Sequence, residues 1–365
     1  MKVVSPLLKR VVYPAFAKAG VFRRTAAEGL AVVTYHGVLP PGYKSTDPVL
    51  DDNLISAEVF RHQIHLLKAN YTVISPEQVL LWSEKQFVFP PRSVLLTCDD
   101  GLVNNLTAML PVLEEESVRC LFFVTGASAS DEPGTLWYEE LFLLFLRAPA
   151  GAFKVSSADL EISDVLDGRA QRRALWWNTV KRLSQLSAAN RKSFLDAARV
   201  RLGTGNAEMT LLASQSPAEQ RFRLLNRTEL KQLSSAGMTI GAHSMSHPLL
   251  SHSSPELARA EIHQSRSCLE AVLGKRVWAF AYPFGDPESI TPEISAMTKE
   301  AGYALAFLNY GGGLGEDLPL YEIPRIHITA SMGLAELEAH VAGFHSSLQR
   351  RAGRSPHQGL RAARA

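Results

Sequence analysis

The chain of 365 residues contains seven short runs of mostly apolar residues that favour β-strands. Most of these runs are continuous rather than alternating in polarity. That pattern is typical of strands buried on both faces, as in a parallel sheet covered by helices. The runs are Ala31–Tyr35, Val94–Cys98, Cys120–Thr125, Met238–Ala242, Val277–Tyr282, Tyr303–Leu308 and Glu322–His327.

Segments with helical periodicity lie between several of the strand-like runs. They are Ala57–Ala69, Asn104–Glu116, Pro255–Leu273 and Pro292–Ala301. Gly274 and Gly302 follow the last two segments, where a glycine commonly ends a helix. Strands that alternate with helices predict an α/β fold, either a barrel or a doubly wound sheet.

The region from about 136 to 227 interrupts this alternation and contains no convincing strand. Four helix-like stretches lie within it: Leu136–Arg147, Arg169–Leu183, Ala188–Leu202 and Ala218–Leu225. We therefore predict a helical insertion in a domain that spans residues 30–340. Residues 1–29 form an N-terminal extension, and residues 341–365 are predicted to be a basic, flexible tail.

Composition narrows the functional classes. The net charge of +2 gives no indication of a nucleic-acid partner. No segment is apolar enough over about 18 residues to predict a membrane span, and the N-terminus lacks the long apolar core of a secretory signal. Three dispersed cysteines suggest a reducing compartment. We expect a cytoplasmic protein. Its basic tail would be either merely solvated or attracted to the anionic lipids of a membrane surface.

Polar residues gather at the C-terminal ends of the predicted strands. His36, Asp99–Asp100, His243, Pro283–Gly285 and His327 each follow or end a run. In an α/β barrel these ends lie on one rim, where active sites are built. Residues far apart in the sequence are therefore expected to converge.

The chemistry of these residues suggests a catalytic metal. His243 and His247 are four residues apart, which would place both on one side of a helical turn. Two imidazoles and one carboxylate leave coordination positions open for water or substrate. Zinc fits this set best, while cobalt, nickel and ferrous iron also fit. Asp-Asp-Gly by itself is equally an ordinary turn sequence. One aspartate would bind the cation and the other would act as general base.

The motifs resemble those of the polysaccharide deacetylases of carbohydrate esterase family 4. Thr97–Gly101 is similar to the first motif, His243–Pro248 to the second, and Ala281–Gly285 to the third. The resemblance covers roughly residues 31–126 and 230–328. It implies a distorted (β/α) barrel, often with seven parallel strands.

The resemblance also implies roles for individual residues. Asp100, His243 and His247 would be the metal ligands, and Asp99 the catalytic base. The backbone N–H of Phe284 would stabilise an oxyanion. His327 would be the general acid that protonates the leaving amine.

Two positions depart from the family pattern. Ala281 stands where the third motif usually has an arginine that orients the catalytic aspartate. The motif here resembles that of a branch of the family in which the arginine is absent and the sequence reads Tyr-Pro-Phe-Gly. Arg325, on the predicted last strand, could supply that guanidinium from another direction. Arg325 and His327 are two residues apart, so they share one face of the strand.

Three functions remain open at this point. The first is removal of N-acetyl groups from an N-acetylhexosamine glycan or glycolipid in exopolysaccharide or cell-envelope metabolism. The second is a carbohydrate-binding relative with weak or lost catalysis. The third is hydrolysis of a cyclic amide or imide on the same fold. The sequence indicates no oligomeric state.

Overall fold

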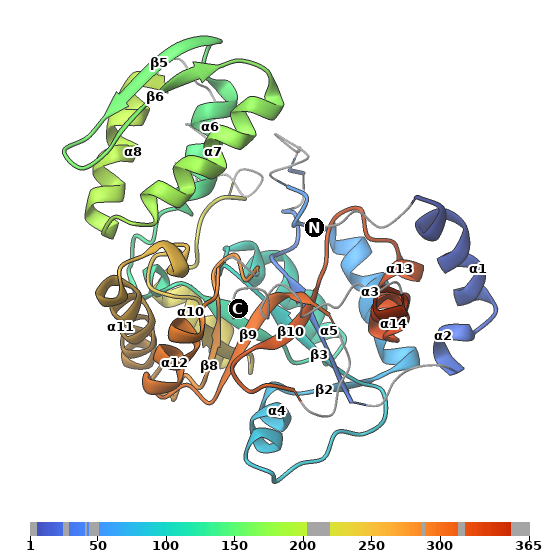
Figure 1. The fold of residues 1–365 in the computed structure, drawn as a ribbon. Coiled ribbons are helices and arrows are strands. Elements are labelled where there is room, and N and C mark those ends of the chain that lie inside the picture. Colours follow the sequence, from blue (N-terminus) through green and yellow to red (C-terminus); the bar gives the residue numbers. More distant parts are fainter. Residues whose placement is uncertain are drawn as a thin grey trace.

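The computed structural model describes residues 6–24, 29–40, 42–43, 51–202, 220–286, 289–312 and 318–351. Seven parallel strands in these residues close into a barrel, which confirms the predicted fold and decides between the two α/β architectures (Figure 1). They are β1 (Leu30–Tyr35), β3 (Ser93–Cys98), β4 (Leu121–Val124), β7 (Thr239–Ala242), β8 (Ala279–Ala281), β9 (Leu305–Gly311) and β10 (Ile323–His327).

The barrel closes because β1 pairs with both β10 and β3. All seven predicted runs form these strands. An eighth strand, β2 (Thr72–Ile74), pairs with β3 outside the closed circuit and was missed, because three residues give too short a pattern. The strand sequences are continuously apolar because both faces of the strands are buried. One face packs in a hydrophobic cluster that includes Phe123 and Phe307, and the other packs in a separate cluster under the helices.

The helices predicted around the barrel are confirmed with small shifts of their ends. They are α3 (Ala57–Asn70), a π-helical turn (Asn105–Met109) that continues into α5 (Leu110–Glu115), α11 (Pro255–Leu273) and α12 (Pro292–Glu300). Two further helices, α4 (Pro76–Ser83) and α10 (Arg227–Ser235), each begin with a capping box. That local signature marks a helix start in the sequence.

The insertion forms a separate unit beside the barrel, which we call the cap (residues 136–202; green in Figure 1). The predicted helices α6 (Trp137–Arg147), α7 (Arg169–Leu183) and α8 (Ala188–Leu202) are confirmed. The prediction that the insertion lacks strands is wrong, because β5 (Gly151–Ser156) and β6 (Glu161–Leu166) form an antiparallel hairpin. Its alternating buried residues, such as Phe153 and Val155, cover the cap's own apolar core.

The fourth predicted helix of the insertion is also wrong in its described part. Residues 220–225 form a turn and two isolated bridges, in which Leu224 pairs with Leu102 and Arg223 with Thr135. These pairings hold the returning chain against the barrel rim. Residues 218 and 219 lie outside the described part of the chain.

The two ends of the described chain pack together on the side of α3. A π-helical turn (Leu8–Val12), α1 (Tyr13–Lys18) and α2 (Val21–Arg24) contact α13 (Leu334–Val341) and α14 (Phe344–Arg351) (Figure 1). Tyr13, Phe16, Phe22 and Phe344 form the aromatic centre of this contact. The predicted flexible tail is therefore helical up to residue 351, and its later arginines lie outside the described residues. None of the described helices combines the length and apolar composition that a membrane crossing requires.

Candidate active site

Strained backbone concentrates at the three motif loops that follow β3, β7 and β8. Asp100, Ser244, His247 and Phe284 all have φ between 55° and 74°, the left-handed region that residues other than glycine rarely adopt. Such conformations cost energy and persist where surrounding structure imposes them, commonly at functional sites. Gly101 is required for a further reason, since a Cβ at this position would lie 2.9 Å from the side chain of Val124.

Asp100, His243 and His247 come together as a buried cluster whose potential ligand atoms all lie within 4.8 Å of one another. Asp100 Oδ1 is 3.6 Å from His243 Nε2 and 3.4 Å from His247 Nε2. Burial favours the neutral carboxyl, but the close approach of His247 and the other nearby imidazoles outweighs it and lowers the pKa of Asp100. The carboxylate is therefore ionised at neutral pH.

The hydrogen bonding of this cluster fits a cation. His243 Nδ1 lies 2.8 Å from the carbonyl oxygen of Ala281, which can only accept, so Nδ1 carries the proton. Burial lowers the pKa of His243 to about 4, so the ring is neutral and its Nε2 presents a lone pair. That lone pair faces the Asp100 carboxylate, whose Oδ1 is buried without a hydrogen-bond partner among the described residues. Two acceptors that face each other in a buried site are satisfied by a metal ion between them.

The spacing of the two histidines predicted a helical turn, and this prediction is wrong. Residues 243–247 form an irregular bend, stabilised by a hydrogen bond of 3.0 Å from the His247 N–H to Ser244 Oγ. The positive φ angles at Ser244 and His247 turn the chain back on itself. The histidines converge because of this bend rather than because of helical periodicity.

Arg325 holds Asp99 through a bidentate ion pair. Its Nη1 and Nη2 donate to Asp99 Oδ1 and Oδ2 at 2.7 and 2.6 Å, and both side chains are buried. Nε of Arg325 donates to the carbonyl of Leu308 at 2.6 Å, and Nη1 also reaches Thr97 Oγ1 at 3.1 Å. Burial acts to raise the pKa of Asp99, but the charge of Arg325 outweighs it and lowers the pKa. A guanidinium from β10 thus orients Asp99, while β8 carries Ala281.

His327 lies at the site with both ring nitrogens beside amide oxygens. Nδ1 is 3.0 Å from Asn309 Oδ1, and Nε2 is 3.0 Å from Asn53 Oδ1. The ring of His36 is 4.8 Å away between centroids. Desolvation, together with repulsion from His36, lowers the pKa of His327 to about 3. In the free protein the imidazole is therefore neutral at neutral pH.

Phe284 forms part of an aromatic wall beside the candidate metal ligands. Its ring centroid lies 4.8 Å from that of His247 and 5.4 Å from those of Tyr138 and Trp177. Its backbone N–H has no backbone acceptor within the described part of the chain. The sequence-predicted oxyanion donor is thus available for a ligand.

The cap supports the loop that carries His247. Trp137 Nε1 donates to the carbonyl oxygens of Ser246 and His247 at 3.0 and 3.1 Å. The Ser246 N–H donates to Glu261 Oε2 at 2.7 Å, while Arg191 of α8 contacts both Ser246 Oγ and Glu261. The cap therefore fixes the geometry of a candidate metal ligand.

Several residues of the site escaped the sequence analysis. Asn309, near the end of β9, stands where polar residues at strand ends were expected to matter, so its position could have indicated it. Asn53 and Tyr138 gave no signal, because neither lies at the end of a barrel strand. The contact of Asn53 with His327 depends on how a loop folds over the rim, and that of Tyr138 with His247 on where the cap places α6.

The family model described as polysaccharide deacetylase matches residues 88–159 and 202–306. No curated protein matches the chain in sequence. Among solved structures, the chain is similar to the deacetylase PplD of Streptococcus pyogenes in complex with acetate, at 16% identity and a TM-score of 0.52, covering 87% of this chain and 99% of that one. It is also similar to IcaB from Ammonifex degensii, at 16% identity and a TM-score of 0.53, covering 87% and 98% of the two chains.

A third similar structure is a de-N-acetylase from Aggregatibacter actinomycetemcomitans, at 13% identity and a TM-score of 0.51, covering 85% of this chain and 99% of that one. At these identities the structural likeness establishes the barrel fold, and the family match covers the first three motif loops. The chain contains a polysaccharide deacetylase domain and is a hydrolase that cleaves carbon–nitrogen amide bonds.

Proposed function

We propose that the protein is a metal-dependent deacetylase that removes N-acetyl groups from an N-acetylhexosamine glycan or glycolipid. The observation that supports this proposal is the buried acceptor pair of Asp100 Oδ1 and His243 Nε2, which a cation between them would satisfy. Asp99, whose pKa is lowered by Arg325, lies directly before Asp100 in the same loop. The Tyr-Pro-Phe-Gly form of the third motif would belong to a branch of the family in which β10 supplies the arginine.

Zinc is the metal we propose for Asp100, His243 and His247, because a carboxylate and two imidazoles suit it; Co²⁺, Ni²⁺ and Fe²⁺ would also fit. When bound, such a cation polarises the acetamide carbonyl and lowers the pKa of water. His243 is preorganised for this role, since its hydrogen bond to Ala281 directs Nε2 into the site.

The chain's own residues would manage the protons of the reaction. Asp99, kept ionised and oriented by Arg325, accepts a proton from the attacking water. The Phe284 N–H donates to the oxygen on which negative charge develops. His327 delivers a proton to the leaving amine, so that acetate and a free amine result. Since its pKa is about 3 in the free protein, this role requires bound substrate to raise that pKa.

The size of the neighbouring pocket favours a glycan over a small cyclic amide. A pocket of about 940 Å³ adjoins the aromatic wall. Its volume is near the upper end of the roughly 300–1,000 Å³ typical of drug-sized ligands. The deacetylases IcaB and PplD share the fold, which is consistent with a role in exopolysaccharide or envelope metabolism.

Acetate release tests the function directly. The protein would be stripped with a chelator, reloaded with one equivalent of Zn²⁺, Co²⁺, Ni²⁺ or Fe²⁺, and mixed with N-acetylglucosamine tetrasaccharide. We expect release only from reloaded protein, and a loss of about a hundredfold or more in His247→Gln because the site loses a ligand. Undiminished release from protein that contains less than a tenth of an equivalent of metal would contradict the proposal.

We also propose that the protein acts at the cytoplasmic face of a membrane. The first 27 residues contain six basic and no acidic residues. Leu7 and Val11 are 65% and 56% exposed on one side of the N-terminal helical segment, and Arg10 lies between them. An exposed apolar face among basic residues is suited to anionic lipid headgroups.

Vesicle sedimentation checks the membrane proposal. The doubly substituted Leu7→Glu/Val11→Glu protein should bind phosphatidylglycerol vesicles at least fivefold more weakly than wild type. Val88→Glu, which changes another exposed valine, should bind normally. Equal binding of all three proteins, or recovery of the native protein in the periplasmic fraction, would overturn the proposal.

A further inference from the structure

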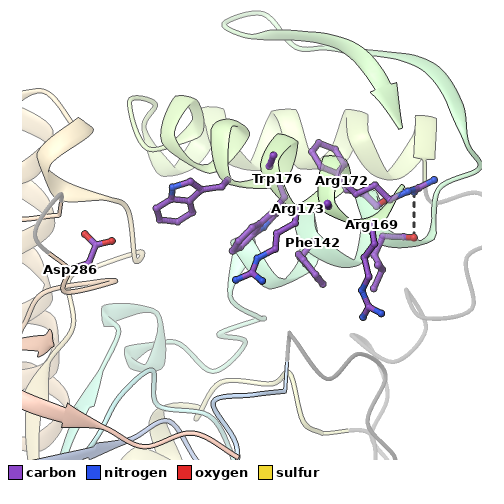
Figure 2. Close-up of a pocket in the computed structure, with 11 residues that line it drawn as sticks. Phe142, Arg169, Arg172, Arg173, Trp176 and Asp286 are labelled. Atoms are coloured by element: carbon purple, nitrogen blue, oxygen red, sulfur yellow. Dashed lines mark hydrogen bonds between the residues drawn. The ribbon is translucent and has the colours of Figure 1, made fainter. Parts of the chain in front are cut away.

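The pocket of about 940 Å³ lies between the cap and the loop that follows β8 (Figure 2). Phe142, Phe145 and Trp176 provide an apolar lining from α6 and α7. Arg169 and Arg173 line it from α7, and Asp286 lines it from the barrel side. The pocket therefore combines an apolar floor with a basic side.

Aromatic ring contacts connect the pocket to the active site. Trp177, which lines it, contacts Phe284 at 5.4 Å between ring centroids, and Phe284 contacts the metal ligand His247 at 4.8 Å. Asp286 is the residue directly after the third motif. A ligand that extends from the active site along Phe284 and Trp177 would therefore enter this pocket.

The pocket-lining face of α7 has a regular order. Arg169, Arg173 and Trp177 are spaced by four residues, so they lie on one side of the helix, about 12 Å from first to last along its axis. Ala170 and Ala174 also line the pocket and leave space beside the longer side chains. The order from the active site outward is thus indole, then guanidinium, then guanidinium.

The arginines of this helix have different tasks. Arg172 is structural, because its Nε donates to the carbonyl of Asp167 at 2.6 Å and its Nη1 to that of Ala148 at 2.8 Å. Arg173 is exposed and makes no hydrogen bond or ion pair with any residue that the structure describes. Its guanidinium is available to a ligand.

The charges of α7 are unfavourable for the helix itself. The helix has five basic and no acidic residues, and three of the basic ones lie near its N-terminus, the positive end of the helix dipole. Lys181 adds an ammonium 5.6 Å from the ring centre of Trp177. A bound anion would offset this repulsion, since guanidinium groups form strong charge-assisted hydrogen bonds with phosphate and carboxylate.

We propose that this pocket binds an anionic group of the glycan, a phosphate ester or a carboxylate, at a distance from the acetamide that is hydrolysed. Trp177 packs against the intervening sugar, and Arg173, with Arg169 one turn further, holds the anion. This inference rests on the proposed function and defines the substrate as an acidic glycan. A phosphate would indicate a lipid- or nucleotide-linked precursor, and a carboxylate an acidic polymer.

Binding to the metal-stripped, full-length protein tests the pocket apart from catalysis. The probes are N-acetylglucosamine tetrasaccharide, the same tetrasaccharide with a phosphate at its reducing end, and one with a terminal glucuronic acid. We expect at least one anionic probe to bind wild type about tenfold more tightly than the neutral one, and the advantage to shrink at high salt. Which probe gains distinguishes the two sources of the anion.

Two arginine variants give the matched comparison. Arg173→Ala should lose most of the advantage of the anionic probe and leave the neutral probe unaffected. Arg201→Ala removes another exposed arginine of the cap, outside the pocket, and should retain the advantage. The Arg169→Ala/Arg173→Ala protein should lose the advantage entirely.

Equal affinity of wild type for neutral and anionic probes would overturn the inference, as would equal losses in Arg173→Ala and Arg201→Ala. Failure of the proposed function is visible separately, as absence of acetate release from the metal-loaded protein with any probe. Charge-selective binding without release would leave the pocket in place and refute the deacetylase. Acetate release without preference for the anionic probes would support the deacetylase and refute the anion-binding pocket.

Discussion

Asp99→Asn should lower the rate of acetate release about a thousandfold while the protein keeps one equivalent of metal. The amide cannot accept the proton of the attacking water, and general-base catalysis typically contributes 10²–10⁴-fold. The metal should remain because Asp100, His243 and His247 are unchanged. Acetate release and metal content by mass spectrometry are measured on the same preparation.

Asp100→Asn provides the contrasting variant. It should lose both activity and metal, because it removes the carboxylate that faces the two imidazoles. If Asp99→Asn lost its metal while Asp100→Asn kept it, the roles of the two aspartates would be reversed. If Asp99→Asn retained full activity, another group would be the base.

Arg325→Ala should have the largest effect on stability. The substitution leaves the carboxylate of Asp99 buried without its ion pair, which typically costs about 3–5 kcal/mol. Arg325→Lys should recover only part of this free energy, because an ammonium cannot form the bidentate contact. Chemical denaturation monitors the free energy of unfolding, and acetate release monitors the orientation of Asp99.

A second-site substitution separates the positioning role from a merely structural one. Ala281 belongs to the same buried cluster as Phe123, over whose ring the Arg325 guanidinium lies at 5.2 Å. Ala281→Arg in the Arg325→Ala background should therefore restore part of the stability and of the activity. Ala281→Arg alone should be destabilising, since the interior already contains one guanidinium. An Arg325→Ala protein with wild-type stability and activity would refute the role of the ion pair.

Local patterns in the sequence identified those elements whose structure depends on near neighbours. Continuous apolar runs gave the barrel strands, because strands buried on both faces need no polar side. Helices α3, α7 and α11 followed from periodicity and end signals. Hairpin β5–β6 was missed, although its buried positions alternate, because helical segments dominate the surrounding insertion.

The sequence by itself determined the barrel strands, the motif loops at their ends and the residue types able to bind a metal, because each is written in short stretches of chain. Tertiary structure alone decided how those stretches meet. Arg325 reaches Asp99 because β10 and β3 both pair with β1, a closure that no local pattern encodes. His243 and His247 meet through a strained bend that packing imposes, and the position of the cap, set by contacts with distant loops, places Trp177 and Arg173 in line with the active site.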